Sequence, residues 1–236
     1  MYQLDYIPDK KEPVKKKTNL IIFVHGLVGG EATWLRTDGQ RSLLDYLYSD
    51  ANLRAHYDFA IYTYFTKFSD LLTRSFYFIK KIYFESSEPF KRNLSIAQIS
   101  DILKTYLDTP GHENVVFIGH SMGGLVAKDN ILKLINEAED RQRLATAGNK
   151  ISENSIPKTK LYVSLAVPHE GSFLALYAML FLKSLQIANL KPFDKFKDDL
   201  SEKWLNKEHE LPDTLYFRGL NDWVVPEAAA FPRETT

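Results

Sequence analysis

Short apolar runs alternate with helical patterns along most of the chain. Five runs bounded by turn residues have the character of buried strands, at residues 20–24, 59–65, 115–118, 161–167 and 214–217. A helix is predicted after Ser95, which forms a capping box with Gln98 and precedes apolar residues at helical spacing. Apolar positions from Ala127 to Ile135 predict a second helix.

The order of these elements indicates the fold class. Strands that are apolar on both faces and separated by helices need helices on both sides, so the pattern predicts an α/β fold with a mostly parallel sheet and right-handed crossovers. Ligands on such sheets bind at the carboxyl ends of the strands. With 236 residues, 44% of them hydrophobic, the chain is expected to form one domain over residues 19–236. Residues 1–18 are interpreted as a solvated basic leader without the apolar core of a signal peptide, so a cytoplasmic location is expected.

Charge and cysteine content narrow the classes of function. Thirty basic residues balance thirty acidic ones, so no overall field favours nucleic acid, and none is expected as a partner. There is no cysteine, which excludes disulfides, thiolate metal sites and cysteine catalysis. The early glycine-rich stretch "HGLVGG" lacks the Lys-Ser/Thr ending of a phosphate loop, so nucleotide binding is not expected.

The most informative motif is "GHSMG", which directly follows the third strand and directly precedes a helix. A serine at such a strand-to-helix turn, Ser121, has an exposed hydroxyl and is predicted to be a nucleophile. Gly119 and Gly123 allow the backbones to pass closely, while His120 beside the serine points away from it. The alternative interpretation is a glycine-rich turn with an incidental serine.

The turn "FVHGLVGG" follows the first strand and suits the binding of an oxyanion. Its backbone can direct an N–H group at a substrate carbonyl, and the residue after the serine supplies a second, so Leu27 and Met122 are the predicted donors. His25 and Gly26 are interpreted as residues that shape this loop, with His25 as a base being the weaker alternative. Because these groups suffice for acyl transfer, neither a metal nor a cofactor is expected.

Two further loops follow the fourth and fifth strands. Asp222 lies in "GLNDWVVP", where a carboxylate can orient a histidine and stabilise its charged form. The alternative for Asp222 is a turn-forming role, and Glu170 in "VPHEGS" is the reserve acid. His169 in the same loop is the reserve base, since it follows a strand's carboxyl end.

Taken together and in this order, "FVHGLVGG", "GHSMGGLVAK", "VPHEGS" and "GLNDWVVP" resemble α/β-hydrolases of the lipase-like group, which includes GPI inositol deacylases and serine-active-site lipase-like proteins. The resemblance covers about residues 19–226. It implies a triad with Ser121 as nucleophile and Asp222 as acid, followed by a histidine. No histidine follows Asp222, so the final strand and its histidine loop are expected to be missing, and the chain as given is expected to be nearly inert.

Two segments bear on the substrate. Residues 67–94 are rich in aromatic residues, and residues 172–210 include the unbroken apolar run "FLALYAMLFL", which is too short to span a bilayer. Either segment could cap an apolar cleft or pack in the core. As caps, they would favour an acyl ester or lipid-like substrate and peripheral contact with a membrane.

The sequence therefore favours a serine hydrolase that cleaves carboxylic esters through an acyl-enzyme. Two alternatives stay open: a catalytically inactive binding or regulatory module of the same fold, and an acyltransferase or lyase. The oligomeric state and the identity of the ester are left open.

Overall fold

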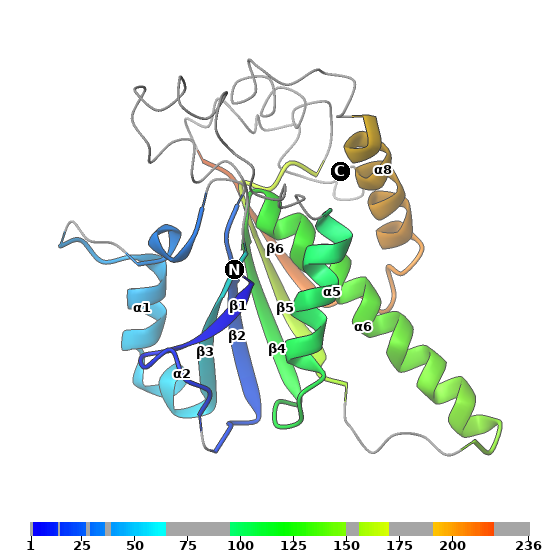
Figure 1. Cartoon of the computed structure of the whole chain (residues 1–236), viewed down its shortest axis with the longest axis horizontal. Helices are drawn as coiled ribbons and strands as arrows, with labels where there is room; N and C mark the ends of the chain where they lie inside the picture. The colour runs from blue at the N-terminus through cyan, green and yellow to red at the C-terminus, as the bar shows by residue number, and fades with distance from the viewer. Residues whose placement is uncertain are drawn as a thin grey trace, which may run out of the picture.

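The computed structural model describes residues 2–13, 15–26, 29–35, 39–64, 95–149, 156–169 and 191–219. They form a six-stranded sheet of order β1-β3-β2-β4-β5-β6 (Figure 1). The strand at one edge, β1, pairs antiparallel with β3, and all other neighbours are parallel. The strands are β1 (Gln3–Ile7), β2 (Asn19–Val24), β3 (Tyr57–Thr63), β4 (Asn114–His120), β5 (Lys158–Leu165) and β6 (Asp213–Phe217).

Helices cover both faces of this sheet (Figure 1). Along β2, Leu20 and Ile22 face one apolar cluster and Ile21 and Phe23 face the other, because successive side chains of a strand point to opposite sides. The first cluster is covered by α5 (Ile96–Leu107), α6 (Met122–Thr146) and α8 (Lys191–Leu205), and the second by the 3-10 turn η1 (Glu31–Thr33), α1 (Leu43–Ser49) and α2 (Ala51–His56). The predicted α/β class with a mostly parallel sheet is confirmed.

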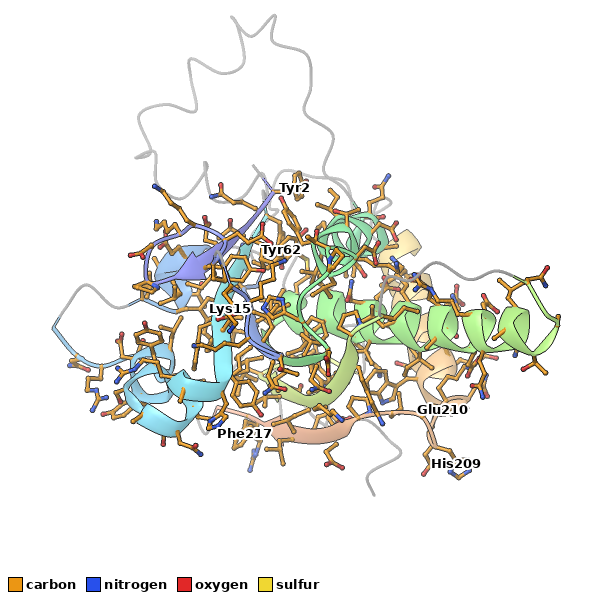
Figure 2. All side chains as sticks on the ribbon, turned by 90° about the horizontal axis from the view of Figure 1, so that it is seen from below. Tyr2, Lys15, Tyr62, His209, Glu210 and Phe217 are labelled. Carbon is orange, nitrogen blue, oxygen red and sulfur yellow. The ribbon has the colours of Figure 1, made fainter. Side chains whose placement is uncertain are left out.

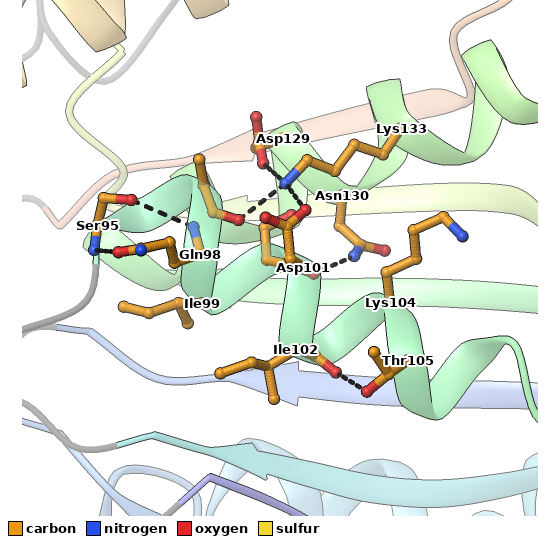
Figure 3. A network of polar contacts seen from close by, with 12 residues as sticks. Ser95, Gln98, Ile99, Asp101, Ile102, Lys104, Thr105, Asp129, Asn130 and Lys133 are labelled. Carbon is orange, nitrogen blue, oxygen red and sulfur yellow. Dashed lines mark hydrogen bonds and ion pairs between the residues drawn. The ribbon is translucent and has the colours of Figure 1, made fainter.

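The contact between α5 and α6 shows how local sequence signals become structure (Figure 3). The Ser95 hydroxyl accepts a hydrogen bond from the Gln98 N–H at 3.2 Å, and the Gln98 side chain accepts one from the Ser95 N–H at 2.9 Å. This is the predicted capping box. On the outer side, Lys133 of α6 reaches α5, where it bonds to the Ala97 carbonyl at 2.8 Å and pairs with Asp101 at 2.6 Å.

All five predicted strands are present, but the N-terminal expectation is wrong in part. Residues Gln3–Ile7, assigned to a solvated leader, form the edge strand β1 of the domain. The physical reason is the alternation of the segment, which buries Leu4 and Tyr6 in the core. Lys17, from the basic run, is also held by the domain: its N–H donates to the Asp58 carboxylate at 2.9 Å, and its Nζ donates to the Tyr57 carbonyl at 2.9 Å.

The segments predicted as caps lie mostly outside the described residues. Residues 67–94 are outside entirely, and of 172–210 only 191–210 are described, including α8. Leu200 and Trp204 of α8 are buried, and the Trp204 ring contacts Tyr162 of β5 edge-on at 5.9 Å between centroids. This part of the second segment therefore packs in the core. Among the described helices, none has an apolar stretch long enough to cross a membrane.

The two edges of the sheet differ. Figure 2 shows Tyr2, next to β1, and Phe217, on β6, at opposite sides of the molecule. Within the described residues no strand lies beyond β6, and the side chains of Leu215 and Phe217 are about half exposed. An outermost strand presents a row of backbone N–H and C=O groups with which another segment could pair.

Candidate active site

Ser121 lies in the sharp turn between β4 and α6, at the carboxyl end of a central strand. Its backbone has φ 54° and ψ −129°, a positive φ that residues other than glycine rarely adopt. The turn is held from both sides, because the Ser121 N–H donates to the Leu165 carbonyl at 3.0 Å and the Ser121 carbonyl accepts from the Gly124 N–H at 3.0 Å. The geometry therefore places a serine at the edge of the sheet where ligands bind.

Glycines surround this turn because other backbone segments come very close. A Cβ atom on Gly119 would lie 2.5 Å from the Cα of Gly124, and one on Gly123 would lie 2.2 Å from the His25 carbonyl oxygen. A Cβ on Gly26 would lie 3.2 Å from the Ser121 hydroxyl oxygen. Gly26 thus lies beside the serine hydroxyl, where a side chain would not fit. Ser121 is only 5% exposed, so the expectation of an exposed hydroxyl is wrong: the approach of Gly26 and the start of α6 bury the residue.

Only one of the two predicted oxyanion donors, Met122, lies among the described residues. Met122 is the first residue of α6, and N–H groups in the first turn of a helix have no partner within the helix. Leu27 lies outside the described residues. Its neighbour Gly26 is the residue beside Ser121, so the early turn and the serine come together at one edge.

His25 is fully buried and engages both of its ring nitrogens. The Tyr64 N–H donates to Nε2 at 3.1 Å, so Nδ1 carries the proton and donates to the Gly26 carbonyl, 2.7 Å away. Burial is the main cause that lowers the pKa of His25 below its usual value. The ring stacks on Tyr64, and the Tyr64 hydroxyl donates to the His25 carbonyl. Neither nitrogen is open to a proton from Ser121.

His120 lies in the serine motif and His169 in the loop after β5, and their rings lie on opposite faces of the sheet. His120 is half-buried and contacts the ring of Trp34 edge-on, on the side of α1. His169 is 2% exposed on the side of α6, and its Nε2 lies 2.8 Å from the Ser164 hydroxyl. Burial, with a smaller contribution from Lys128, holds the pKa of His169 well below its usual value. No hydrogen bond between His169 and Ser121 is found in the described part of the chain.

Asp222 and Glu170, the candidate acids, lie outside the described residues. The strand that leads to Asp222 is described, and it ends at the same edge as the serine. The Phe217 carbonyl at the end of β6 accepts from the Ala166 N–H at 2.7 Å, just after β5, whose Leu165 carbonyl accepts from Ser121. The ends of β4, β5 and β6 are thus hydrogen-bonded in series at this edge.

Sequence reasoning missed two residues that support the turn. The Tyr162 hydroxyl, from β5, donates to the Gly124 carbonyl in the first turn of α6 at 2.9 Å, and both groups are buried. Gly124 had a local signal, since it continues "GHSMGG", whereas Tyr162 had none. Among the described residues there is no cluster of three or more side chains able to hold a metal ion.

Comparison with known proteins gives a consistent assignment. A family model described as "PGAP1-like alpha/beta domain" matches residues 17–174. Protein SERAC1 of Homo sapiens is 27% identical over 204 residues, covering 76% of this chain and 26% of that protein. Protein SERAC1 of Bos taurus is 28% identical with the same coverage, 76% and 26%. The chain therefore spans about a quarter of the length of these curated relatives.

Solved structures with a similar arrangement include Est1E from Butyrivibrio proteoclasticus, with a TM-score of 0.48, 12% identity and coverage of 98% of this chain and 81% of that chain. An alpha/beta hydrolase enzyme, MGS-MChE2, from the metagenome of lagoon sediments at Mar Chica, Morocco, has a TM-score of 0.43, 15% identity and coverage of 96% and 93%. The family match extends over more than half of the chain, through the early turn, the serine turn and β5. The chain belongs to the PGAP1-like alpha/beta domain family and is a lipase-like α/β-hydrolase.

Proposed function

We propose that this protein is a serine hydrolase that cleaves carboxylic esters through an acyl-enzyme. The observation that carries the proposal is the backbone of Ser121, held at φ 54° between β4 and α6 with Gly26 against its hydroxyl. A strained turn persists only where its surroundings over-determine it, and such turns cluster at functional sites.

In the proposed reaction, the Ser121 hydroxyl attacks the carbonyl carbon of the ester and gives its proton to a general base. The N–H groups of Met122 and Leu27 stabilise the negative charge on the carbonyl oxygen. The base then protonates the leaving alcohol, and an acyl-Ser121 ester remains. Water attacks this ester with the help of the same base, which releases the carboxylic acid and restores the serine. Asp222 is proposed to orient the base.

The base itself is proposed to be a histidine outside this sequence, in the longer protein. Within the chain, His25 and His169 are buried with Nε2 already engaged, and the His112 ring donates to the Asp58 carboxylate at the amino ends of the parallel strands. His56 ends α2 just before the amino end of β3, and His209 follows α8. These engagements favour a base supplied from elsewhere. They equally favour the second candidate function, an inactive binding or regulatory module.

The proposed substrate is an acyl ester or lipid-like small molecule of at least medium chain length. This rests on the apolar run at 173–182 in the sequence, next to the loop that follows β5. Peripheral contact with a membrane is part of the same proposal, because lipid-like substrates reside there.

The experiment uses a fluorophosphonate probe and a medium-chain acyl ester with the full-length protein. Ser121→Ala is expected to abolish labelling and turnover, while Ser49→Ala, at an exposed helix end, leaves both unchanged. Residues 1–236 alone are expected to turn over about six orders of magnitude more slowly, the typical loss when a triad's base is removed. Labelling that survives Ser121→Ala would assign the reaction to another serine. A full-length protein that neither labels nor turns over esters would favour the binding module.

A further inference from the structure

Directly behind the serine turn lie three buried polar side chains from β5 and the loop after it. The Tyr162 hydroxyl donates to the Gly124 carbonyl in the first turn of α6 at 2.9 Å. Ser164 lies two residues further along the same face of β5, and its hydroxyl lies 2.8 Å from Nε2 of His169. All three side chains are at most 2% exposed, so none of these groups can exchange its partner for water.

The imidazole of His169 is held by one of its two nitrogens. Its Nε2 contacts the Ser164 hydroxyl, whereas Nδ1 is buried without a hydrogen-bond partner. The bond between Nε2 and Ser164 therefore anchors the ring, and with it the loop after β5, to the strand.

Packing also connects the loop after β5 to the start of α6. A Cβ atom on Gly124 would lie 2.1 Å from a methyl group of Val167, so the loop after β5 is pressed against the first turn of α6. The His169 N–H donates to the Val167 carbonyl at 3.0 Å, which links the histidine to this contact. The His169 ring also meets Tyr216 of β6 edge-on, with 5.2 Å between centroids. The loop thus joins three elements at the point where α6 begins.

Resting on the proposed function, we propose that His169 is a positioning residue that anchors the loop after β5 to Ser164 and so holds Val167 against Gly124. This contact fixes the first turn of α6, and with it Ser121 and the Met122 N–H. The Tyr162 hydroxyl holds the same turn through its bond to the Gly124 carbonyl, so removal of either side chain loses a buried contact with the start of α6. Preorganisation of an oxyanion donor requires that its backbone cannot relax during the reaction. This role also distinguishes His169 from a general base, because its Nε2 is engaged by the Ser164 hydroxyl.

The test compares four single variants of the full-length protein. His169→Phe keeps an aromatic ring but removes the nitrogen that contacts Ser164, and His169→Gln restores a hydrogen-bonding group. Tyr162→Phe removes the hydroxyl that bonds to the Gly124 carbonyl. Tyr62→Phe is the matched control, because the buried Tyr62 hydroxyl also donates to a backbone carbonyl, that of Ile99 in α5, at 2.8 Å and away from the serine turn.

Two independent readouts are measured, ester hydrolysis and amide hydrogen exchange. In ester hydrolysis, His169→Phe and Tyr162→Phe are expected to lower kcat about tenfold with KM unchanged, His169→Gln to regain most of it, and Tyr62→Phe to match the wild type. In amide hydrogen exchange, residues 124–128 are expected to exchange about tenfold faster in the first two variants only. The second readout needs no activity, so it tests the role of His169 even if the protein proves not to be an esterase.

Exchange at 124–128 that is equal in His169→Phe, Tyr162→Phe and the wild type would overturn the proposal. A loss of kcat of more than about a thousandfold in both His169→Phe and His169→Gln would overturn it too, because such a loss is typical of a missing base. A similar effect of Tyr62→Phe on kcat would show that the loss of any buried hydroxyl suffices, and it would also count against the specific route.

Discussion

At the scale of single residues, the site depends on the serine and on neighbouring glycines that have no side chain. Ser121 holds a backbone conformation that costs of order 1–3 kcal/mol, and its neighbours compensate by fixing both of its peptide groups. Gly119, Gly123 and Gly26 have no side chains where backbone atoms or the hydroxyl come within contact distance. A serine turn of this kind therefore needs small residues on both sides of the nucleophile.

Gly123→Ala tests this requirement. The added methyl group would meet two backbone carbonyl oxygens, of His25 at 2.2 Å and of Val24 at 2.3 Å, neither of which can rotate away. We expect the free energy of unfolding to fall by about 2–3 kcal/mol, measured by denaturant titration. Gly30→Ala is the control, since nothing lies within 4 Å of the added atom and the backbone there is extended. Equal stability of the two variants would contradict the close approach at Gly123.

At the scale of elements, helix ends and buried faces determine which segments reach the site. The cap at Ser95 begins α5 at the point where Ile96, Ile99 and Leu103 turn inward. This face packs on α6, whose N-terminus carries the serine turn. The link through Asn130 is specific, because its side-chain amide donates to the buried Ser100 carbonyl at 2.9 Å. Stability of α5 thus contributes to the position of α6.

Ser95→Ala is expected to lower the free energy of unfolding by about 1 kcal/mol, because the Gln98 N–H loses its acceptor at the helix start. The matched control within the same helix is Thr105→Ala. Thr105 is exposed, and its hydroxyl only bonds back to the Ile102 carbonyl, so a change within about 0.5 kcal/mol is expected. Thermal and denaturant unfolding of both variants provide the measurement. A larger loss for Thr105→Ala than for Ser95→Ala would refute the importance of the cap.

At the scale of the whole molecule, buried histidines tie distant parts of the sheet together. His25 joins the ends of β2 and β3, and His169 joins the loop after β5 to Ser164 of that strand. His112 bonds to Asp58 at 2.9 Å at the amino ends of the parallel strands, next to the ring of Tyr6 from β1. In all three, burial is the main cause that lowers the pKa below its usual value. The folded protein therefore holds these rings neutral.

This makes stability depend on pH with a definite sign. Below pH about 6.5 the histidines of the unfolded chain bind protons, whereas the buried histidines of the folded protein stay neutral. The stabilisation is therefore present above that pH and is lost as the pH falls. We expect the free energy of unfolding to decrease as the pH falls below about 6.5, with a slope that approaches about 1.4 kcal/mol per pH unit for each histidine that stays neutral. His169→Gln should flatten this slope, measured as unfolding free energy at several pH values. An unchanged slope in that variant would show that His169 takes up its proton in the folded state.

The sequence by itself determined the features that depend on local pattern. Short apolar runs predicted five strands, the Ser95–Gln98 pair predicted the start of α5, and "GHSMG" predicted a serine between a strand and a helix, because each signal arises within a few neighbouring residues. It did not predict β1, since five lysines nearby outweighed the short alternation at Gln3–Ile7.

Only the tertiary structure decided which side chains meet. His25 meets Tyr64 because β2 lies beside β3, and Tyr162 meets Gly124 because β5 lies beside β4 and beneath α6. The same packing engages Nε2 of His169 with Ser164, although the sequence placed that histidine at a strand end like any candidate base. Such contacts join residues 38 and 39 positions apart, and their geometry follows from strand order and burial, which no local pattern encodes.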